Sequence, residues 1–160
     1  MIENENQKQM VTFQLGAEHY GIDIMDVDEI YRVEHIRPIP NAPTYVEGIF
    51  NLRGDIVPII NLHRRFHIKK AELSEDDELL SGSIIININN TKIGIIIDKI
   101  LSVVTIDTKS VQPPPQMISG IGAEYIQGVV HQEEGYLIIL DILRLFDSKE
   151  LQQLSMVKSR

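Results

Sequence analysis

Apolar and polar residues alternate along several short stretches of the chain, and this period-two pattern predicts a fold made mainly of β-strands. The stretch MVTFQL, residues 10–15, places Val, Phe and Leu at alternate positions. The stretch HYGIDI, residues 19–24, follows a Gly-Ala-Glu turn and is predicted to return as the partner strand. Between Met25 and Tyr31 the apolar positions are three to four residues apart, which predicts a short helix.

The strongest pattern in the chain is an internal duplication. Residues 45–66, YVEGIFNLRGDIVPIINLHRRF, align without a gap with residues 125–146, YIQGVVHQEEGYLIILDILRLF. Five of the 22 aligned pairs are identical, where ordinary composition predicts roughly one. Seven further pairs keep an apolar side chain, so the same packed face is expected twice. The identical pairs are Tyr45/Tyr125, Gly48/Gly128, Ile59/Ile139, Arg64/Arg144 and Phe66/Phe146.

The two copies differ most at their centres. Residues 51–55 read Asn-Leu-Arg-Gly-Asp, whereas the aligned residues 131–135 read His-Gln-Glu-Glu-Gly. A glycine between two apolar runs is typical of a tight hairpin turn, so both stretches are predicted to be hairpin tips, one cationic and one anionic. Arg53 is the first candidate for a specific role, although the residues alone favour an arginine on a solvated turn. Pro58 has no amide hydrogen and is expected at a sheet edge or a bulge.

A weaker match at an offset of 73 residues pairs Phe13 with Ile86 and Gly21 with Gly94, and extends the duplication to nearly the whole chain. The predicted fold class is therefore mainly β, with two small β-barrels side by side, short helices and a C-terminal helix. The expected organisation is one domain over residues 10–150, with subdomains at about 10–80 and 83–147 and an exposed connection at 67–82. Whether strands are exchanged between the subdomains stays open, and residues 1–9 and 155–160 are expected to be disordered.

Composition narrows the classes of function. The 160 residues, 43% of them hydrophobic, suffice for one domain with a buried core. With 15 Lys and Arg against 23 Asp and Glu, the net charge is −8, the wrong sign for binding nucleic acid. The absence of cysteine excludes disulfides, thiolate metal sites and a cysteine nucleophile. The chain shows no secretory leader and no apolar run of about 18 residues, so a soluble protein without membrane insertion is expected.

No motif indicates catalysis or a metal site. His63 and His67 have a ligand-like spacing, but no third ligand follows and cationic residues surround them, so two surface histidines are expected. Gly120-Ile121-Gly122 follows a proline run rather than a strand, and predicts a flexible loop rather than a dinucleotide site. Glu133 and Glu134 are adjacent on a hairpin tip and point apart, so they form no acid–base pair. A binding module without a cofactor is favoured over an enzyme.

Four stretches resemble the CheW family of bacterial chemotaxis adaptors, over roughly residues 10–150. They are HYGIDIMDVDEI (19–30), NAPTYVEGIFNLRGDIVPIINL (41–62), IGIIIDKI (93–100) and EYIQGVV (124–130). The resemblance implies two five-stranded SH3-like β-barrels around a common core, with no catalytic activity. It also implies two partners, the cytoplasmic tip of a methyl-accepting chemoreceptor and the regulatory domain of the histidine kinase CheA. The implied location is the cytoplasm, at membrane-associated receptor arrays.

The functional positions of the family carry over residue by residue. Receptor-binding positions fall on Val27, Glu29, Gly48, Arg53 and Ile56, and positions tied to receptor or kinase coupling fall on Gly94, Ile100, Val103 and Gly128. The resemblance favours a binding role for Arg53, whereas Gly48 and Gly128 can be purely structural because both copies keep them. For Val103, core packing is an equal alternative. Two other functions stay open: a CheV-type or paralogous chemosensory module, and a small-ligand or metal-dependent enzyme.

Overall fold

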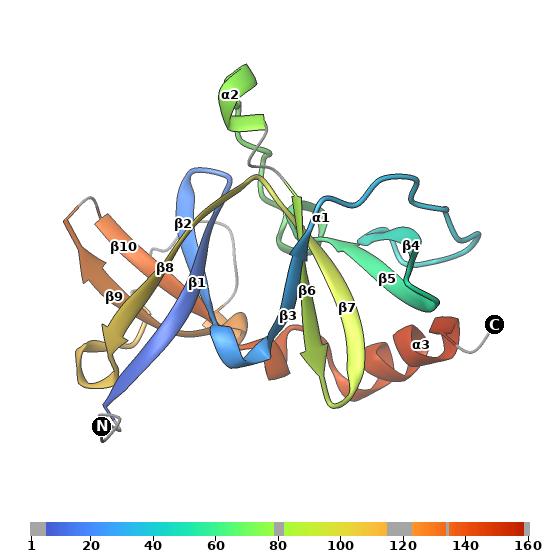
Figure 1. Ribbon diagram of the computed structural model, residues 1–160. Coiled ribbons are helices and arrows are strands. Elements are labelled where there is room, and N and C mark those ends of the chain that lie inside the picture. The colour runs from blue at the N-terminus through green and yellow to red at the C-terminus, as the bar shows by residue number, and fades with distance from the viewer. Residues whose placement is uncertain (1–5, 79–81, 115–122, 134, 159–160) are drawn as a thin grey trace.

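Two five-stranded sheets lie side by side in the computed structural model, which describes residues 6–78, 82–114, 123–133 and 135–158 (Figure 1). The predicted mainly-β fold is confirmed. The first sheet has the order β8-β1-β2-β10-β9, with β1 at Gln7–Leu15, β2 at Glu18–Asp23, β8 at Lys99–Asp107, β9 at Ile126–Gln132 and β10 at Gly135–Leu140. The second has the order β3-β6-β7-β5-β4, with β3 at Val27–Tyr31, β4 at Val46–Leu52, β5 at Asp55–Asn61, β6 at Gly82–Ile88 and β7 at Thr91–Ile97.

Helical segments are short and lie mostly between the strands. The longest is α3 at Ser148–Lys158, which is the predicted C-terminal helix and packs against β5. The others are α1 at Leu62–Phe66, α2 at Glu75–Glu78, and four 3-10 turns: η1 at Ile24–Asp26, η2 at Thr108–Ser110, η3 at Ala123–Tyr125 and η4 at Ile142–Arg144.

Each sheet takes strands from both copies of the duplication. The chain leaves the first sheet after β2 and enters it again after β7, so β1 pairs with β8 and β2 pairs with β10. The contiguous subdomains 10–80 and 83–147 therefore do not correspond to the two sheets, because strands are exchanged between them. The duplication is still visible in the pairing. Ile59 faces Gly94 in the parallel pair of β5 and β7, and the equivalent Ile139 faces Gly21 in the parallel pair of β10 and β2.

One continuous core joins the two sheets. Phe13 of β1 and Ile86 of β6 belong to different sheets, but both are fully buried in the same cluster of apolar side chains. This shared cluster means that neither sheet buries its apolar face alone. We therefore treat the two sheets as one structural unit.

Aromatic residues from the duplicated stretch meet where the two copies touch. The ring of Tyr45 lies 6.0 Å from that of Phe146, and the ring of Phe66 lies 5.2 Å from that of Tyr125. These four residues make up two of the five identical pairs in the sequence alignment. Part of the identity between the copies therefore serves the contact between them.

Residues 25–31 form a 3-10 turn and an edge strand, so the expected helix was wrong. Asp23 caps the turn by accepting the backbone N–H of Met25 at 2.9 Å, and β3 then pairs antiparallel with β6. The register of β3 shifts between Val27 and Glu29. This irregularity adds one residue to the strand and interrupts its period of two, which produces the helix-like spacing of apolar residues.

Of the two expected places, an edge or a bulge, Pro58 occupies no edge but lies in an interior strand, next to the register shift of β4 between Val46 and Gly48. It faces Ile49 of β4, but the N–H and C=O of Ile49 bond to Arg37 on the opposite side. The ring nitrogen of Pro58 therefore points towards β7, whose pairing with β5 begins only at Ile59. No ladder hydrogen bond is lost, because the missing donor lies just outside the paired region.

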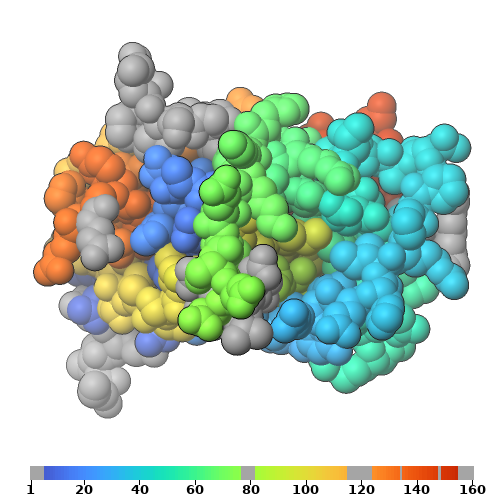
Figure 2. Space-filling view, turned by 90° about the horizontal axis from the view of Figure 1, so that it is seen from above, coloured from blue at the N-terminus to red at the C-terminus, as the bar shows by residue number. Residues whose placement is uncertain are grey.

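The connection between the copies runs over the junction of the two sheets. Residues 67–78, green in Figure 2, lie between the part formed by the first strands and β9–β10 and the part formed by residues 31–60. Short helix α2 within this segment extends away from both sheets (Figure 1). Strand β1 begins at Gln7 and α3 ends at Lys158, so regular structure extends into the ranges 1–9 and 155–160. The loop predicted at Gly120-Ile121-Gly122 lies outside the described residues.

Candidate functional site

The tip between β4 and β5 is a tight turn that presents Arg53 to solvent. Arg53 and Gly54 have positive φ angles of 50° and 91°, as a two-residue hairpin turn of this twist requires. The side chain of Asn51 stabilises the turn, since its Oδ1 accepts the backbone N–H of Gly54 at 2.8 Å. The Arg53 side chain is 67% exposed, so its guanidinium is accessible to a partner.

Arg53 forms a two-point ion pair with Glu29 of strand β3. Nη1 of Arg53 donates to Oε1 of Glu29 at 3.3 Å, and Nη2 donates to Oε2. These hydrogen bonds lower the pKa of Glu29. The rings of Tyr31 and Phe50 also meet, with their centres 5.3 Å apart and their planes tilted by 44°. Because β3 and β4 are the two edges of the second sheet, these side chains draw the edges together and close the sheet into a barrel.

A second ion pair lies beside the first. Nζ of Lys92, on β7, is 3.3 Å from Oδ2 of Asp55 at the start of β5. The hydrogen bonds from Arg53 are the main cause of the lowered pKa of Glu29, and the positive charge of Lys92 lowers it further. The hydrogen bonds to Glu29 are the main cause of the raised pKa of Arg53, and the negative charge of Asp55 raises it further. The four side chains thus form two neighbouring ion pairs, Arg53 with Glu29 and Lys92 with Asp55.

The two apolar side chains among the receptor-binding candidates also lie on the second sheet. Val27 begins β3 and is half-buried against the main core cluster. Ile56, half-buried on β5, faces Asn51 across the hairpin that carries Arg53. The structure therefore brings Glu29 and Arg53 into direct contact, and places Val27 and Ile56 on strands that lead to them.

Gly48 and Gly128 occupy equivalent places where another segment crosses an edge strand. Arg37 exchanges two backbone hydrogen bonds with β4, at 2.8 and 2.9 Å, and Gln112 does the same with β9 at the same distances. A β-carbon on Gly48 would overlap the carbonyl group of Arg37, and one on Gly128 would lie 2.8 Å from the carbonyl oxygen of Gln112. Close backbone approach explains both glycines without any partner.

The remaining candidates differ in how far they reach the surface. Gly94 faces Ile59, and a β-carbon there would lie 2.6 Å from the Ile59 side chain, which gives this glycine a packing role. Ile100 is half-buried against the main core. Val103 is 52% exposed on β8, an edge strand of the first sheet, so it is not a core residue.

A buried carboxylate, Asp98, joins four segments at the crossing from β7 to β8. Its side chain is fully buried, and Oδ2 accepts the backbone N–H groups of Gly16 at 2.7 Å and Ala71 at 3.1 Å. Nε2 of His63, on α1, lies 2.9 Å from the same oxygen. Burial alone raises the pKa of Asp98, but the close Nε2 of His63 and the backbone hydrogen bonds from Gly16 and Ala71 outweigh it and lower the pKa below its ordinary value. The expectation of a surface His63 was wrong, because this histidine is buried beside Asp98.

Arg65 holds helix α3 at the junction of the two copies. Its guanidinium carbon lies 4.8 Å from the ring centre of Tyr45, and 5.4 Å from those of Tyr125 and Phe146. Nη1 and Nη2 donate to the carboxylate of Glu150 at 2.8 and 2.9 Å. Burial and the hydrogen bond to Glu150 raise the pKa of Tyr45 to about 12. Sequence reasoning missed this role of Arg65, which only the cluster of cationic residues after Leu62 could have suggested.

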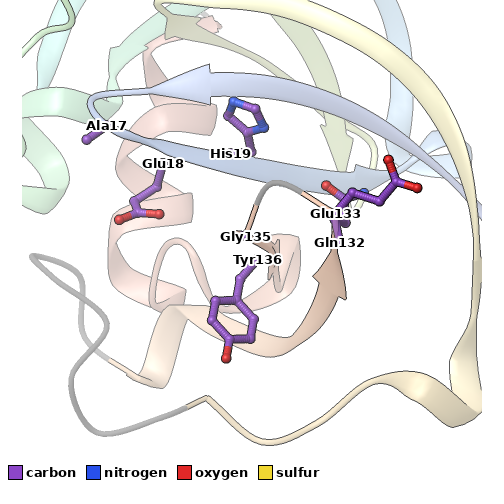
Figure 3. Close-up of a pocket in the computed structure, with 7 residues that line it drawn as sticks. All are labelled: Ala17, Glu18, His19, Gln132, Glu133, Gly135 and Tyr136. Atoms are coloured by element: carbon purple, nitrogen blue, oxygen red, sulfur yellow. The ribbon is translucent and has the colours of Figure 1, made fainter.

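A cavity of about 430 Å³ lies between the β1–β2 turn and the second hairpin tip, and His19 and Tyr136 are among the residues that line it (Figure 3). Of its carboxylates, Glu18 begins β2 and Glu133 lies at the hairpin tip, and the two point in different directions. Over the described ranges, no group of three or more metal-ligating side chains could hold a metal ion. In the same ranges, no helix is long and apolar enough to cross a membrane.

Known proteins match nearly the whole chain. A model of the CheW-like domain family matches residues 9–150. The chain is 60% identical over 155 residues to chemotaxis protein CheW of Treponema pallidum, covering 97% of this chain and 91% of that protein. It is 33% identical over 144 residues to chemotaxis protein CheW of Klebsiella aerogenes, covering 90% and 84% respectively.

A solved structure supports the same assignment. The crystal structure of the scaffolding protein TtCheW from Thermoanaerobacter tengcongensis matches with a TM-score of 0.80 and 36% identity, covering 94% of each chain. The resemblance seen in the sequence is thereby confirmed over both sheets. The chain belongs to the CheW-like domain family, whose members are chemotaxis scaffold proteins and not enzymes.

Proposed function

We propose that this chain binds the cytoplasmic tip of a chemoreceptor through the second sheet and the regulatory domain of CheA through the first. The observation that carries the receptor assignment is the exposed guanidinium of Arg53 at the tip of the β4–β5 hairpin. The equivalent tip of the first sheet carries Glu133. Because the scaffold is repeated and the charge at its tip is reversed, the two tips suit partners of different chemistry.

The chemistry of Arg53 fits an acidic or carbonyl-rich receptor surface. A guanidinium has five N–H donors in a planar fork, and Glu29 engages only one edge of it. The remaining donors can reach a carboxylate or a backbone carbonyl of a partner. Lysine offers a single ammonium and reproduces this geometry poorly. Half-buried Val27 and Ile56 would supply the apolar part of the same contact.

Kinase coupling is assigned to the exposed edge of the first sheet. Val103 is an apolar side chain with half of its surface in water, on a strand with one free edge. Ile100 lies on the same strand, closer to the core. Gly94 and Gly128 contribute by packing, since each makes room for a neighbouring segment. A protein that binds both partners at once would be recruited from the cytoplasm to the receptor arrays.

Replacing Arg53 with alanine tests the receptor assignment. The Arg53→Ala variant should bind a soluble receptor-tip fragment about tenfold more weakly or worse, because central arginine contacts are often dominant. Arg53→Lys should recover only part of the loss. Binding to the CheA regulatory domain should stay unchanged, and Glu133→Ala is the matched control at the other tip. Equal receptor affinity of Arg53→Ala and wild type at low ionic strength, where charge contacts are strongest, would return Arg53 to the role of a solvated turn residue.

A further inference from the structure

A second cavity, of about 540 Å³, lies between the β1–β2 turn and residues 67–72 of the connection between the copies. The two walls are in close contact, because a β-carbon on Gly16 would lie 2.5 Å from the Ile68 side chain and 3.1 Å from the carbonyl oxygen of Lys69. A volume of this size is typical of sites for small molecules. None of the described residues that line it is a receptor- or kinase-binding candidate.

Tyr20 of β2 lines this cavity, and its hydroxyl group has no hydrogen-bond partner among the described residues. The side chain is fully buried, and its ring stacks on that of Phe13, with the centres 6.0 Å apart and the planes inclined by 18°. Burial, and after it the negative charge of Glu18, raise the pKa of this hydroxyl, so it stays protonated and can donate. A buried hydroxyl without an acceptor is unfavourable, and a ligand in the cavity would supply that acceptor.

Charged side chains also line the cavity and set the charge of a suitable ligand. Lys69 and Lys70 are exposed, and neither is paired with a carboxylate in the part of the chain that the structure describes. Glu18 and Glu72 balance the charge of the two lysines, and His67 is a further titratable group on the lining. This balance suits a monoanion better than a dianion, because the two glutamates repel a second negative charge.

We propose that this cavity binds a small monocarboxylate with an apolar body, whose carboxylate accepts a hydrogen bond from the Tyr20 hydroxyl. The ammonium groups of Lys69 and Lys70 balance the charge of the ligand. Leu15 and Ile68, which also line the cavity, can contact its apolar part. The site goes beyond the adaptor role and does not depend on it, since receptor and kinase binding are assigned to other surfaces.

Nuclear magnetic resonance titration of the whole chain with butyrate tests the proposal. The backbone amide signals of Gly16, Ala17 and Lys70 should shift and saturate in wild type. Tyr20→Phe should weaken butyrate binding about tenfold, because a hydrogen bond to a charged acceptor is lost. The double variant Lys69→Met/Lys70→Met should weaken it about threefold, the scale of exposed charge interactions. Tyr136→Phe, a half-exposed tyrosine on the other cavity, is the matched control and should bind as wild type does.

Stability without butyrate gives a second, independent reading. Tyr20→Phe should unfold at the same or a higher urea concentration than wild type, because it removes a buried hydroxyl that has no partner. A lower urea midpoint would show that the hydroxyl is already satisfied in the free protein, and would overturn the proposal.

Three results of the titration would also overturn it. Shifts that do not saturate would mean that butyrate has no site in the cavity. Equal butyrate affinity of either variant and wild type would mean that the hydroxyl or the lysines take no part. Inorganic phosphate that bound as tightly as butyrate would indicate a general anion site and not one for a monocarboxylate.

Discussion

Asp98 should be the most sensitive buried position for stability, and its amide variant gives a graded test. The carboxylate is fully buried and holds the β1–β2 turn through Gly16, the connection between the copies through Ala71, and helix α1 through His63. Asp98→Ala removes every one of these contacts. Asp98→Asn keeps an oxygen where Oδ2 stands, so both backbone N–H groups can still be bound.

The magnitudes follow from these contacts. Removing this buried acceptor leaves two backbone N–H groups and His63 unsatisfied, at roughly 1–3 kcal/mol for each buried group, or about 3–5 kcal/mol together. We expect Asp98→Ala to lose free energy of unfolding in this range. Hydrogen bonds to a charged acceptor are stronger than neutral ones by about 1 kcal/mol each. Asp98→Asn keeps two weakened bonds and weakens the contact with His63, so a loss of about 1–2 kcal/mol is expected.

The free energy of unfolding that Asp98 contributes should depend on pH, in a direction set by the pKa of its carboxyl group. The pKa of Asp98 lies below its ordinary value of 3.8, so the folded state binds this proton less readily than the unfolded state does. The stabilisation is therefore fully present above pH 3.8, and is lost as the pH falls through the lower value of the folded state. In urea titrations, wild type and Asp98→Asn should differ by a constant amount at neutral pH and converge in strong acid.

Hydrogen exchange and a control variant make the test decisive. In Asp98→Ala the amide protons of Gly16 and Ala71 should exchange faster, because their acceptor is gone. Asp28→Asn, on the exposed side of β3, is the control and should leave the urea midpoint unchanged. If Asp98→Ala unfolded at the wild-type urea midpoint with both amides still protected, Asp98 would not join these segments.

Two further predictions concern the sheets as a whole. Val103→Glu should weaken binding of the CheA regulatory domain while changing the melting temperature by only a few degrees, because the side chain is 52% exposed; unchanged kinase binding by calorimetry would remove Val103 from the interface. Urea unfolding of the whole chain should be one transition seen equally by circular dichroism and fluorescence, because β1 pairs with β8 and β3 with β6. A fragment of residues 83–160 that folded alone would contradict this.

The local pattern of the sequence predicted most strands and the first hairpin tip, but it could not predict their partners. A period of two marks a half-buried strand without saying which strand lies beside it. Thr12 of β1 and Ser102 of β8 are 90 residues apart, yet the Thr12 hydroxyl donates to the Ser102 carbonyl at 2.7 Å. The exchange of strands between the copies depends on such distant contacts. Sequence analysis could therefore only leave it open.

Residues of the candidate site could be predicted where they belong to a family motif. Residues whose role depends on being buried in the fold could not. The difference between the two hairpin tips already singled out Arg53, and the resemblance added Glu29; their ion pair joins residues 24 positions apart. Asp98 ends an apolar run and resembles an ordinary turn residue in sequence. His63 was expected at the surface because its neighbours are cationic, but α1 is only five residues long and buries one side of it. Leu62, His63 and Phe66 share that side, whereas Arg64 faces away.

The duplication itself separates positions that fold the chain from positions free to differ. Tyr45, Tyr125, Phe66 and Phe146 meet between the copies, and a change in any of them would disturb both halves of the core. Arg53, in contrast, occupies a turn whose only requirement is a backbone that can adopt positive φ. The aligned tip in the second copy could therefore exchange a cation for carboxylates without affecting the packed face. An ion pair like that of Glu29 and Arg53 cannot form there, because the aligned residues are Ser102 and Glu133. The two barrels thus share one way of folding, and differ in charge at the places where each can meet a partner.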